Sequence, residues 1–312
     1  MARIKVAVIG VGKIAQDQHL PVIAGNADYE LVGVVSQRGV HAAGAPTFAT
    51  PAELYAVATV DAVAICTPPH VRHALARQAL DAGKHVMLEK PPAATLAEMH
   101  DLTAAAKAAG RVMLATWHSR YNAAVDAAKA RLKGQRLKRL AIEWKEDVRR
   151  WHPGQNWIWD AGNFGVFDPG INALSILTKI APTPLFVKSA KLLYPENRDT
   201  PIAASLVFTC PAAAAGAPLS AEFDWRQEGE QSWNIDIETE DGVALRLTHG
   251  GSRLLVNGAA AVTAPMQEYE GIYAHFAELL RAGESEMDFS PFQLVGDAFL
   301  VGSRRVVPPF LW

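Results

Sequence analysis

The sequence predicts an α/β protein of two domains: a doubly wound parallel sheet in residues 1–118 and a second domain of mainly antiparallel strands in residues 119–312. Two observations support this prediction. In the first part, short apolar runs alternate with segments of helical spacing, as in successive βαβ units. In the second part, apolar and polar residues alternate over several longer segments, as they do in antiparallel strands.

The elements of the first domain follow from apolar runs and their stop signals. The run Val6–Ile9 predicts a buried strand that ends at Gly10. A helix is expected from Lys13 to about Ala24, because a glycine and an asparagine follow it. The remaining elements are expected as strands at 30–35, 60–66, 85–88 and 111–115, and helices at 72–82 and 96–109.

The second domain is predicted to begin with two helices, at 121–132 and 166–180. Strands are expected at 185–193, 203–208, 220–225, 233–238, 243–247 and 253–256. The small residues of Ala212–Pro218 indicate a hairpin loop between two of them. Two last helices are expected at 269–280 and 292–305.

The composition excludes several classes of protein. Half of the residues are apolar and the formal net charge is −2, with no long run of one sign, so neither nucleic acid nor a membrane surface is an expected partner. The two cysteines are far apart, which favours a reducing compartment. No signal peptide, transmembrane segment or metal site is expected, and the sequence predicts a cytoplasmic protein.

A glycine-rich turn joins the first strand to the first helix. Its pattern is Gly10-x-Gly12-x-x-Ala15, and it also contains Lys13 and Ile14. Glycine allows close backbone approach, and the helix N-terminus offers free N–H groups to a phosphate. The alternative is a purely structural turn, but the flanking strand and helix favour a dinucleotide site.

The end of the second strand distinguishes NADP from NAD. An acidic residue there would hold the ribose 2′-hydroxyl of NAD. This chain has Ser36, Gln37 and Arg38 instead, with no acidic residue between Val34 and Val40. A guanidinium suits a 2′-phosphate, so NADP is the favoured cofactor and NAD the alternative. The competing interpretation is an arginine in a solvated loop.

The sequence Glu89-Lys90-Pro91 follows the strand at 85–88. Ligands of doubly wound sheets bind at the carboxyl ends of the strands. Lys90 could there donate to a substrate hydroxyl or lower the pKa of a nearby group, and a cis bond to Pro91 would aim it inward. The alternative is a surface lysine in a loop.

The neighbouring strand, which contains Cys66, ends at Thr67-Pro68-Pro69-His70. By the same topology, this segment is expected beside the nicotinamide. His73 is expected on a helix face or at a cap rather than as a ligand.

A cluster in the second domain surrounds Asp168. Asn172 lies four residues further on, so a helix opened by Pro169 would place both side chains on one face. The structural interpretation makes Asp168 a helix N-cap, whereas the functional one makes it an acid or base. Upstream lie aromatic residues that suit a pyranose face but also any core: Trp151, His152, Trp157 and Trp159.

Taken together, these motifs resemble the Gfo/Idh/MocA oxidoreductases, a family named for glucose–fructose oxidoreductase and inositol dehydrogenase. The resemblance rests, in chain order, on Gly10-x-Gly12, Thr67-Pro68-Pro69 with His73, Glu89-Lys90-Pro91 and Gly165-x-x-Asp168-x-Gly170-x-Asn172. It implies an N-terminal Rossmann domain and a C-terminal α+β domain with a large, mainly antiparallel open sheet. That sheet often forms a subunit interface, so a homodimer is expected. The C-terminal helices could pack back on the first domain.

One residue departs from the family pattern and narrows the resemblance to a subgroup of the family. Most family members have a histidine four residues after the aspartate, where this chain has Asn172. In this it is similar to bacterial sugar 1-dehydrogenases that act on L-arabinose and D-galactose. The resemblance implies substrate contacts from Lys90, His118, Glu146, Trp151, His152, Asp168, Asn172 and Trp233. Cofactor contacts are expected from Gly10, Gly12, Lys13, Ile14, Ser36, Gln37, Arg38, Cys66, Thr67, Pro68, His70, Glu89 and Lys90.

The resulting expectation is NAD(P)-dependent oxidation of an aldopyranose at C1 to the aldonolactone. Asp168 would accept the C1 hydroxyl proton, and Lys90 would donate a hydrogen bond to the sugar and tune the pKa of the aspartate. Asn172 would orient either the sugar or the aspartate. Whether Lys90 or Asp168 takes the proton stays open. Two alternatives remain: a dehydrogenase of another polyol or cyclitol, such as inositol, and a non-catalytic dinucleotide-binding regulator.

Overall fold

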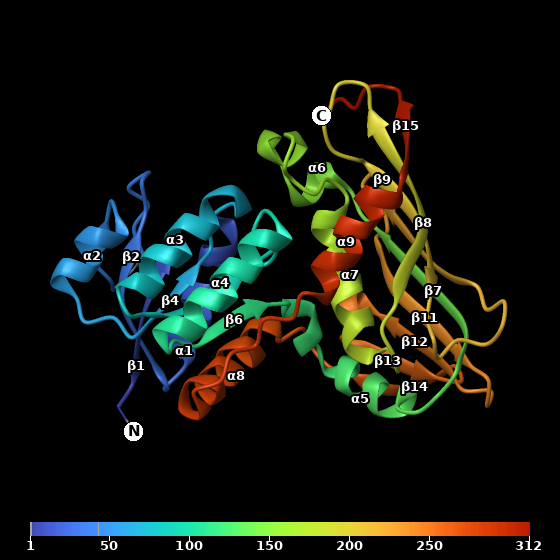
Figure 1. Ribbon diagram of the computed structural model, residues 1–312, viewed down its shortest axis with the longest axis horizontal. Helices are drawn as coiled ribbons and strands as arrows, with labels where there is room; N and C mark the ends of the chain where they lie inside the picture. The colour runs from blue at the N-terminus through green and yellow to red at the C-terminus, as the bar shows by residue number, and fades with distance from the viewer. Residues whose placement is uncertain (1, 43) are drawn as a thin grey trace. The chain divides into compact units, whose positions relative to one another are not determined.

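The structure is a computed structural model that describes residues 2–42 and 44–312. It contains two compact units, which are treated separately. The first comprises the chain up to His118 together with Glu268–Phe289, and the second comprises Ser119–Gln267 and Ser290–Trp312 (Figure 1). The predicted division into folding domains at residue 118 stays a prediction, because compactness does not test independent folding.

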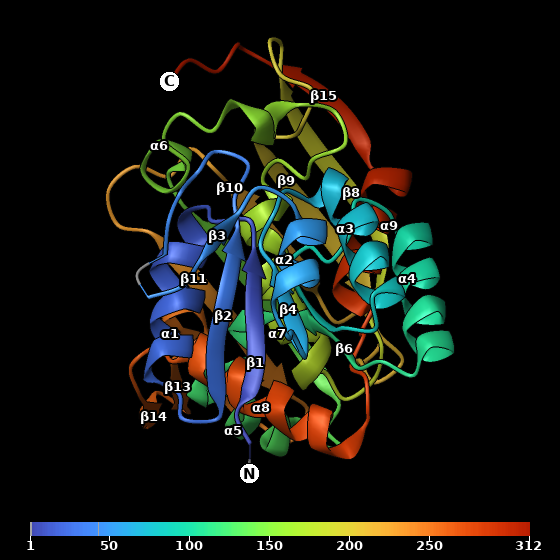
Figure 2. The same ribbon diagram turned by 90° about the vertical axis from the view of Figure 1, so that its left-hand side faces the viewer.

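The first unit is built on a six-stranded sheet in which every neighbouring pair is parallel. Its strands are β1 (Ile4–Ile9), β2 (Tyr29–Val35), β3 (Thr47–Phe48), β4 (Ala62–Ile65), β5 (His85–Glu89) and β6 (Met113–Thr116). Figure 2 shows β1 and β2 side by side. Their order is β3-β2-β1-β4-β5-β6, that of a dinucleotide-binding Rossmann sheet. The predicted doubly wound parallel sheet is confirmed.

The helices of this unit are α1 (Leu20–Gly25), α2 (Pro51–Val57), α3 (Pro69–Asp81), α4 (Leu96–Ala109) and α8 (Glu268–Ala282). Before α1 lies the π-helical turn Ala15–His19, which belongs to the helix expected from Lys13. At the start of α4, the Thr95 hydroxyl oxygen accepts a hydrogen bond from the Glu98 N–H, and the Glu98 carboxylate accepts one from the Ala94 N–H. Gly110 ends the helix with φ of 61°. The short elements β3 and α2 were not predicted.

The second unit contains a nine-stranded sheet in the order β14-β13-β12-β11-β7-β10-β9-β8-β15. Its strands are β7 (Leu137–Lys145), β8 (Phe186–Pro195), β9 (Ala203–Thr209), β10 (Leu219–Asp224), β11 (Ser232–Thr239), β12 (Ala244–Thr248), β13 (Arg253–Val256), β14 (Ala259–Thr263) and β15 (Ser303–Val307). Only the β7–β10 and β8–β15 pairs of these strands are parallel. The predicted antiparallel character and the β9–β10 hairpin are confirmed.

Three strands of this sheet depart from the sequence prediction. The helix expected at 292–305 is wrong at its end: α9 (Ser290–Val301) stops before Gly302, and β15 follows. A Cβ on Gly302 would lie 2.3 Å from the carbonyl oxygen of Ala298 and 3.1 Å from Leu192 of β8, so glycine permits this close turn. The strands β7 and β14 were not predicted at all.

Helices cover one face of the nine-stranded sheet: α5 (Ala123–Leu132), α7 (Phe167–Ile180) and α9 (Figure 1). α7 is buried along most of its length, including Phe167, Ile171 and Leu174. The short α6 (Val148–Trp151) follows β7. Among the residues described, no helix combines the length and apolar character that crossing a bilayer requires.

Candidate active site

The phosphate turn occupies the point where the strand order reverses, between β1 and β4. The φ of Gly10 is +92°, and a Cβ there would lie 2.8 Å from the Thr67 methyl carbon and 3.0 Å from the Thr67 nitrogen. Glycine is therefore required for the two strand ends to meet. A Cβ on Gly12 would meet no chain atom within 4 Å, so the turn is open to a phosphate. The residues present fit a dinucleotide.

The end of β2 carries the residues that were predicted to recognise a 2′-phosphate. The Ser36 hydroxyl oxygen accepts a hydrogen bond of 3.0 Å from the backbone N–H of Val40, which closes the turn. Arg38 is exposed, and in residues 2–42 and 44–312 its guanidinium has no hydrogen-bond or ion-pair partner. A cation is thus available where an NAD-specific site would have a carboxylate.

Lys90 lies directly after β5, next in the sheet to the strand that leads to Thr67. Its peptide bond to Pro91 is cis. Its backbone N–H donates a hydrogen bond of 2.9 Å to the carboxylate of Glu89. The structure thus brings the phosphate turn, Thr67 and Lys90 to one edge of the sheet.

Glu89 belongs to a buried network that the sequence analysis missed. Its Oε1 is 2.9 Å from His19 Nε2 and accepts a hydrogen bond of 2.7 Å from the Tyr269 hydroxyl. The other ring nitrogen of His19 is 2.9 Å from the hydroxyl of Tyr273. Because these residues come from distant parts of the chain, no local spacing signalled them. As a cofactor contact, Glu89 stays a prediction.

Glu89 and His19 form an ion pair. Burial alone would raise the pKa of Glu89, but hydrogen bonding and the charge of His19, with help from Tyr269, lower it to about 2. Burial alone would lower the pKa of His19, but Cys66, Tyr273 and Glu89 raise it well above its ordinary value. The first unit therefore contains a buried ion pair, and its hydrogen bonds fix Glu89, the residue that precedes Lys90.

Glu89→Gln is expected to lower the free energy of unfolding by about 3 kcal/mol at neutral pH, because His19 loses its buried partner. The pKa of Glu89 falls from 4.5 to about 2 on folding, so its contribution is complete above 4.5 and disappears as the pH falls to about 2. Urea unfolding of both proteins across this range should show the difference shrinking with acidification. The exposed control Glu30→Gln should show no such trend, and a pH-independent gap would contradict the ion pair.

His118, a predicted substrate contact, lies at the end of the first unit. Its Nδ1 is 2.8 Å from the carboxylate of Glu268, and its ring stacks on Tyr269 with 5.7 Å between centroids. Burial opposes a higher pKa for His118, but the Glu268 carboxylate outweighs it and raises that pKa. An imidazole ring can hydrogen-bond to a sugar oxygen, and the contact of His118 with substrate stays a prediction.

In the second unit, Asp168 lies inside the first turn of α7. The helix begins at Phe167 with Val166 as its N-cap, so the interpretation of Asp168 as an N-cap is wrong. A Cβ at Gly165, just before the helix, would lie 2.4 Å from the carbonyl oxygen of Pro201, which explains the glycine. Asn172 follows one turn after Asp168 on the same side of the helix.

Four further predicted residues gather near this turn. The Nε2 of His152 is 3.5 Å from a carboxylate oxygen of Asp168, and both side chains are partly exposed. Next to His152, the Trp151 ring packs edge-on against Trp233 with 5.4 Å between centroids. The Trp233 indole donates a hydrogen bond of 3.0 Å to the buried carboxylate of Glu146.

Gln231 supports this cluster and was missed by the sequence analysis. Its side-chain oxygen accepts hydrogen bonds of 2.6 Å from the Asp147 backbone and 3.4 Å from the Trp151 indole. Its side-chain nitrogen donates to the carbonyl oxygens of Gln227 and Gly229. A glutamine in a loop carries no signal of such a role, because its partners are set by the tertiary fold.

The cluster around α7 combines groups that suit a sugar. A carboxylate and an imidazole can accept or donate a proton, while an amide and a second carboxylate can hold hydroxyls. Indole faces pack well against the apolar face of a pyranose. Trp159 is instead part of the core, packed against Trp225 and Phe310.

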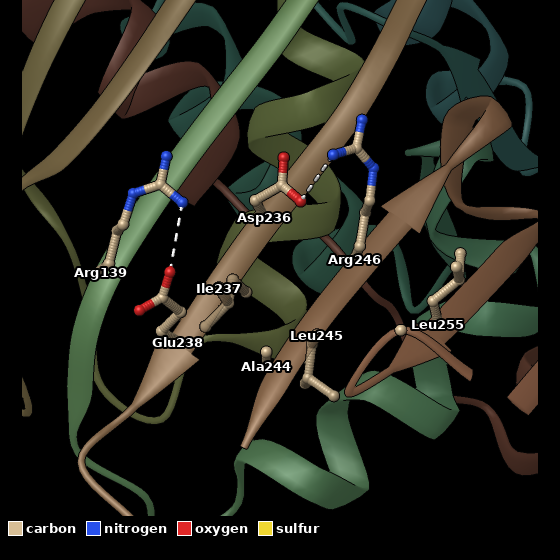
Figure 3. A pocket seen from close by; sticks show the side chains of 9 residues that line it. Arg139, Asp236, Ile237, Glu238, Ala244, Leu245, Arg246 and Leu255 are labelled. Carbon is tan, nitrogen blue, oxygen red and sulfur yellow. Dashed lines mark hydrogen bonds and ion pairs between the residues drawn. The ribbon is translucent and has the colours of Figure 1, made fainter. Parts of the chain in front are cut away.

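A hollow of about 160 Å³ on the nine-stranded sheet lies apart from these residues. Two ion pairs cross it, Arg139–Glu238 at 3.5 Å and Arg246–Asp236 at 3.4 Å (Figure 3). None of the predicted site residues lines it. Nor do the described residues contain a group of three or more histidine, cysteine, aspartate or glutamate side chains arranged for a metal ion.

Comparison with known proteins gives matches along the whole chain. A model of an oxidoreductase family with an NAD-binding Rossmann fold, GFO_IDH_MocA, matches residues 4–116. Galactose 1-dehydrogenase of Pseudomonas fluorescens is 44% identical over 313 residues, which cover 99% of each chain. The crystal structure of the D-galactose-1-dehydrogenase protein from Rhizobium etli is 50% identical, with a TM-score of 0.94 and coverage of 100% of this chain and 99% of that one.

A more distant structure shares the fold. KijD10, a 3-ketoreductase from Actinomadura kijaniata, is 19% identical with a TM-score of 0.82, over 98% of this chain and 100% of that one. The family match covers the unit that holds the phosphate turn and Lys90, and the full-length matches extend through Asp168. The chain belongs to the Gfo/Idh/MocA oxidoreductase family, and its first unit is an NAD(P)-binding Rossmann domain.

Proposed function

We propose that this protein is a sugar 1-dehydrogenase that oxidises D-galactose, and the related L-arabinose, to the aldonolactone with NAD(P). One observation carries the proposal: an acid–base pair, Asp168 with His152, lies in one cluster with Trp151, Trp233 and Glu146. Such a cluster offers both proton transfer and a surface for a pyranose. The full-length similarity to galactose 1-dehydrogenases supports the choice of sugar.

The nicotinamide, when bound, supplies the hydride acceptor. Oxidation at C1 also requires the C1 hydroxyl to lose its proton, and we assign that proton to Asp168. His152, 3.5 Å from Asp168, orients the carboxylate and stabilises its charge. Asn172 binds a sugar hydroxyl or the aspartate, and Lys90 donates a hydrogen bond to an oxygen of the reacting carbon or its neighbour.

The two sugars differ by a single group. L-Arabinopyranose is D-galactopyranose without the exocyclic CH₂OH, so one pocket can accept both. A missing group of this size changes kcat/KM by about 10- to 200-fold at most, unless a buried polar side chain waits for the lost hydroxyl. Both sugars are therefore expected substrates.

A panel of aldoses and cyclitols, each with NAD and with NADP, tests this proposal through the absorbance of the reduced cofactor. Galactose and arabinose should be oxidised, and myo-inositol should not. Oxidation of inositol alone would favour the cyclitol alternative. Tight cofactor binding without turnover of any compound would favour a regulator.

The cofactor preference is assigned to NADP because of Arg38. Arg38→Ala is expected to lower kcat/KM for NADP about 10- to 100-fold, the worth of a charge-assisted hydrogen-bond pair to phosphate. The values for NAD serve as the internal control and should change little, because NAD has no 2′-phosphate. Steady-state kinetics with both cofactors at saturating galactose measure the effect. Equal losses for the two cofactors would contradict the assignment.

The homodimer expected from the family resemblance stays a prediction. The sheet face with the paired charges Arg139–Glu238 and Arg246–Asp236 is its expected site (Figure 3). Light scattering coupled to size-exclusion chromatography would give the mass in solution. The cytoplasmic location also stays a prediction.

A further inference from the structure

Arg72 is a buried cation that neither the phosphate turn nor the proposed chemistry uses directly. It is the fourth residue of α3, and only 3% of it is exposed. In the helix it shares the buried face with Ala76, Ala79 and Leu80. An arginine at a core-facing position is unusual, because burying a charge is costly unless hydrogen bonds compensate.

The hydrogen bonds of Arg72 converge on two strand ends. One terminal nitrogen donates to the carbonyl oxygens of Glu89 and Pro91, and the other donates to the carbonyl oxygen of Thr67. Glu89 and Pro91 are the two neighbours of Lys90. The guanidinium therefore holds the backbone on both sides of Lys90 and links this segment to the end of β4.

The geometry requires an arginine. A guanidinium is planar and presents its N–H groups as a rigid fork, so one side chain can serve several fixed acceptors. A lysine ammonium is a single point on a flexible stem and could not hold all three carbonyls in the same way. The positive charge also offsets the carbonyl dipoles in this buried place.

A second set of hydrogen bonds holds the same segment, residues 89–91. The Glu89 carboxylate accepts a hydrogen bond of 2.9 Å from the Lys90 backbone N–H, and Glu89 is itself held by His19 and Tyr269. The backbone on either side of Lys90 is thus fixed through both its N–H and its flanking carbonyls. Preorganisation of this kind matters because a displacement of about 1 Å can lower a rate about 100-fold.

We infer that Arg72 is a positioning residue that holds the backbone of Lys90 and Thr67 in the arrangement needed for hydride transfer. The inference rests on the proposed function for its kinetic consequence, but its structural consequence is independent of the substrate. Loss of the fork should loosen residues 89–91 while leaving the phosphate turn in place.

The test uses Arg72→Lys and Arg72→Ala, with Arg3→Ala as the matched control. Arg3 also donates to a backbone carbonyl of the first unit, that of Tyr29, at 2.8 Å, but at the amino end of β2. Hydrogen–deuterium exchange should show faster exchange of the Lys90 amide in both Arg72 variants and not in the control. Because Arg72→Lys keeps the charge, it also covers the case in which Arg72→Ala does not fold.

Kinetics with galactose and NADP supply the second readout. Both Arg72 variants should lower kcat about 100-fold, while KM for NADP changes only a few-fold. Millimolar guanidinium should restore part of the activity of Arg72→Ala by refilling the site. A merely structural role would instead lower the folded fraction, with kcat per folded molecule unchanged.

The outcomes separate this inference from the proposed function. If the unmodified protein oxidises no sugar, the proposed function fails, and the exchange of the Lys90 amide still decides on Arg72. Exchange in Arg72→Lys equal to that of the unmodified protein would overturn the positioning role. So would a kcat for Arg72→Lys equal to that of Arg3→Ala.

Discussion

Replacing Asp168 by asparagine is expected to lower kcat for galactose about 1,000-fold, within the range that a general base contributes. The change keeps the size of the side chain and removes its capacity to take the C1 proton. The KM for galactose should change far less, because asparagine can still hydrogen-bond to His152 and to the sugar. Steady-state kinetics at saturating cofactor measure both quantities.

The matched control is Asp126→Asn. Asp126 lies in the same unit and also forms an ion pair, with its carboxylate 2.9 Å from the Lys179 ammonium. Its loss should leave kcat unchanged within about twofold, as expected for an exposed carboxylate that is not among the proposed site residues. A normal rate in Asp168→Asn would remove this residue from the mechanism and transfer the base role to Lys90.

Lys90→Met is expected to lower kcat by at least about 100-fold, because the sugar oxygen loses a charged donor in the transition state. Methionine preserves the length of the side chain and leaves the backbone contacts of Glu89 in place. Lys84→Met is the control, since Lys84 directly precedes β5, whereas Lys90 follows its other end. Kinetics of both variants at saturating NADP should separate them, and a near-normal turnover of Lys90→Met would contradict the mechanism.

The double variant Lys90→Met with Asp168→Asn tests whether the two side chains act in the same step, the oxidation at C1. Residues that act as a unit show losses that are far from additive. The double variant should therefore be little worse than the poorer single variant. Fully multiplicative losses would show that the two side chains act in independent steps.

Most secondary-structure elements of the first unit could be predicted, because the residues that indicate them are close together in the sequence. Helix α4 was predicted with its observed bounds, since its alanine-rich sequence strongly favours a helix and Gly110 closes it. The strands β1, β2, β4, β5 and β6 are short apolar runs that end at glycine or at polar residues. Among the described elements of this unit, β3 and α2 were not predicted, because two and seven residues give too little periodicity.

The second sheet was harder for a physical reason. The central strand β7 has consecutive polar residues, Lys138 and Arg139, where the register with β11 shifts. This bulge breaks the alternation on which a strand prediction depends. At the C-terminus, the apolar residues that pack α9 run on toward β15, and only Gly302 separates the two.

The candidate site shows the same contrast between local and distant signals. Lys90, Asp168 and the phosphate turn could be proposed from the sequence because each belongs to a contiguous motif. Arg72 could have been suspected from its spacing with Ala76 and Ala79, which places it on the buried face of a helix. The partnership of His19 with Tyr273 was not predictable, because a fold must bring residues together that the sequence keeps far apart.

Oxidation of galactose at C1 can be followed by the transfer of an isotope label from C1 to the cofactor. Galactose deuterated at C1 is incubated with the protein and NADP, and the reduced cofactor is examined by mass spectrometry. We expect the reduced nicotinamide to carry the deuterium and the product to be galactonolactone. Reduced cofactor without the label, formed from this substrate, would show that the hydride comes from another carbon and would contradict oxidation at C1.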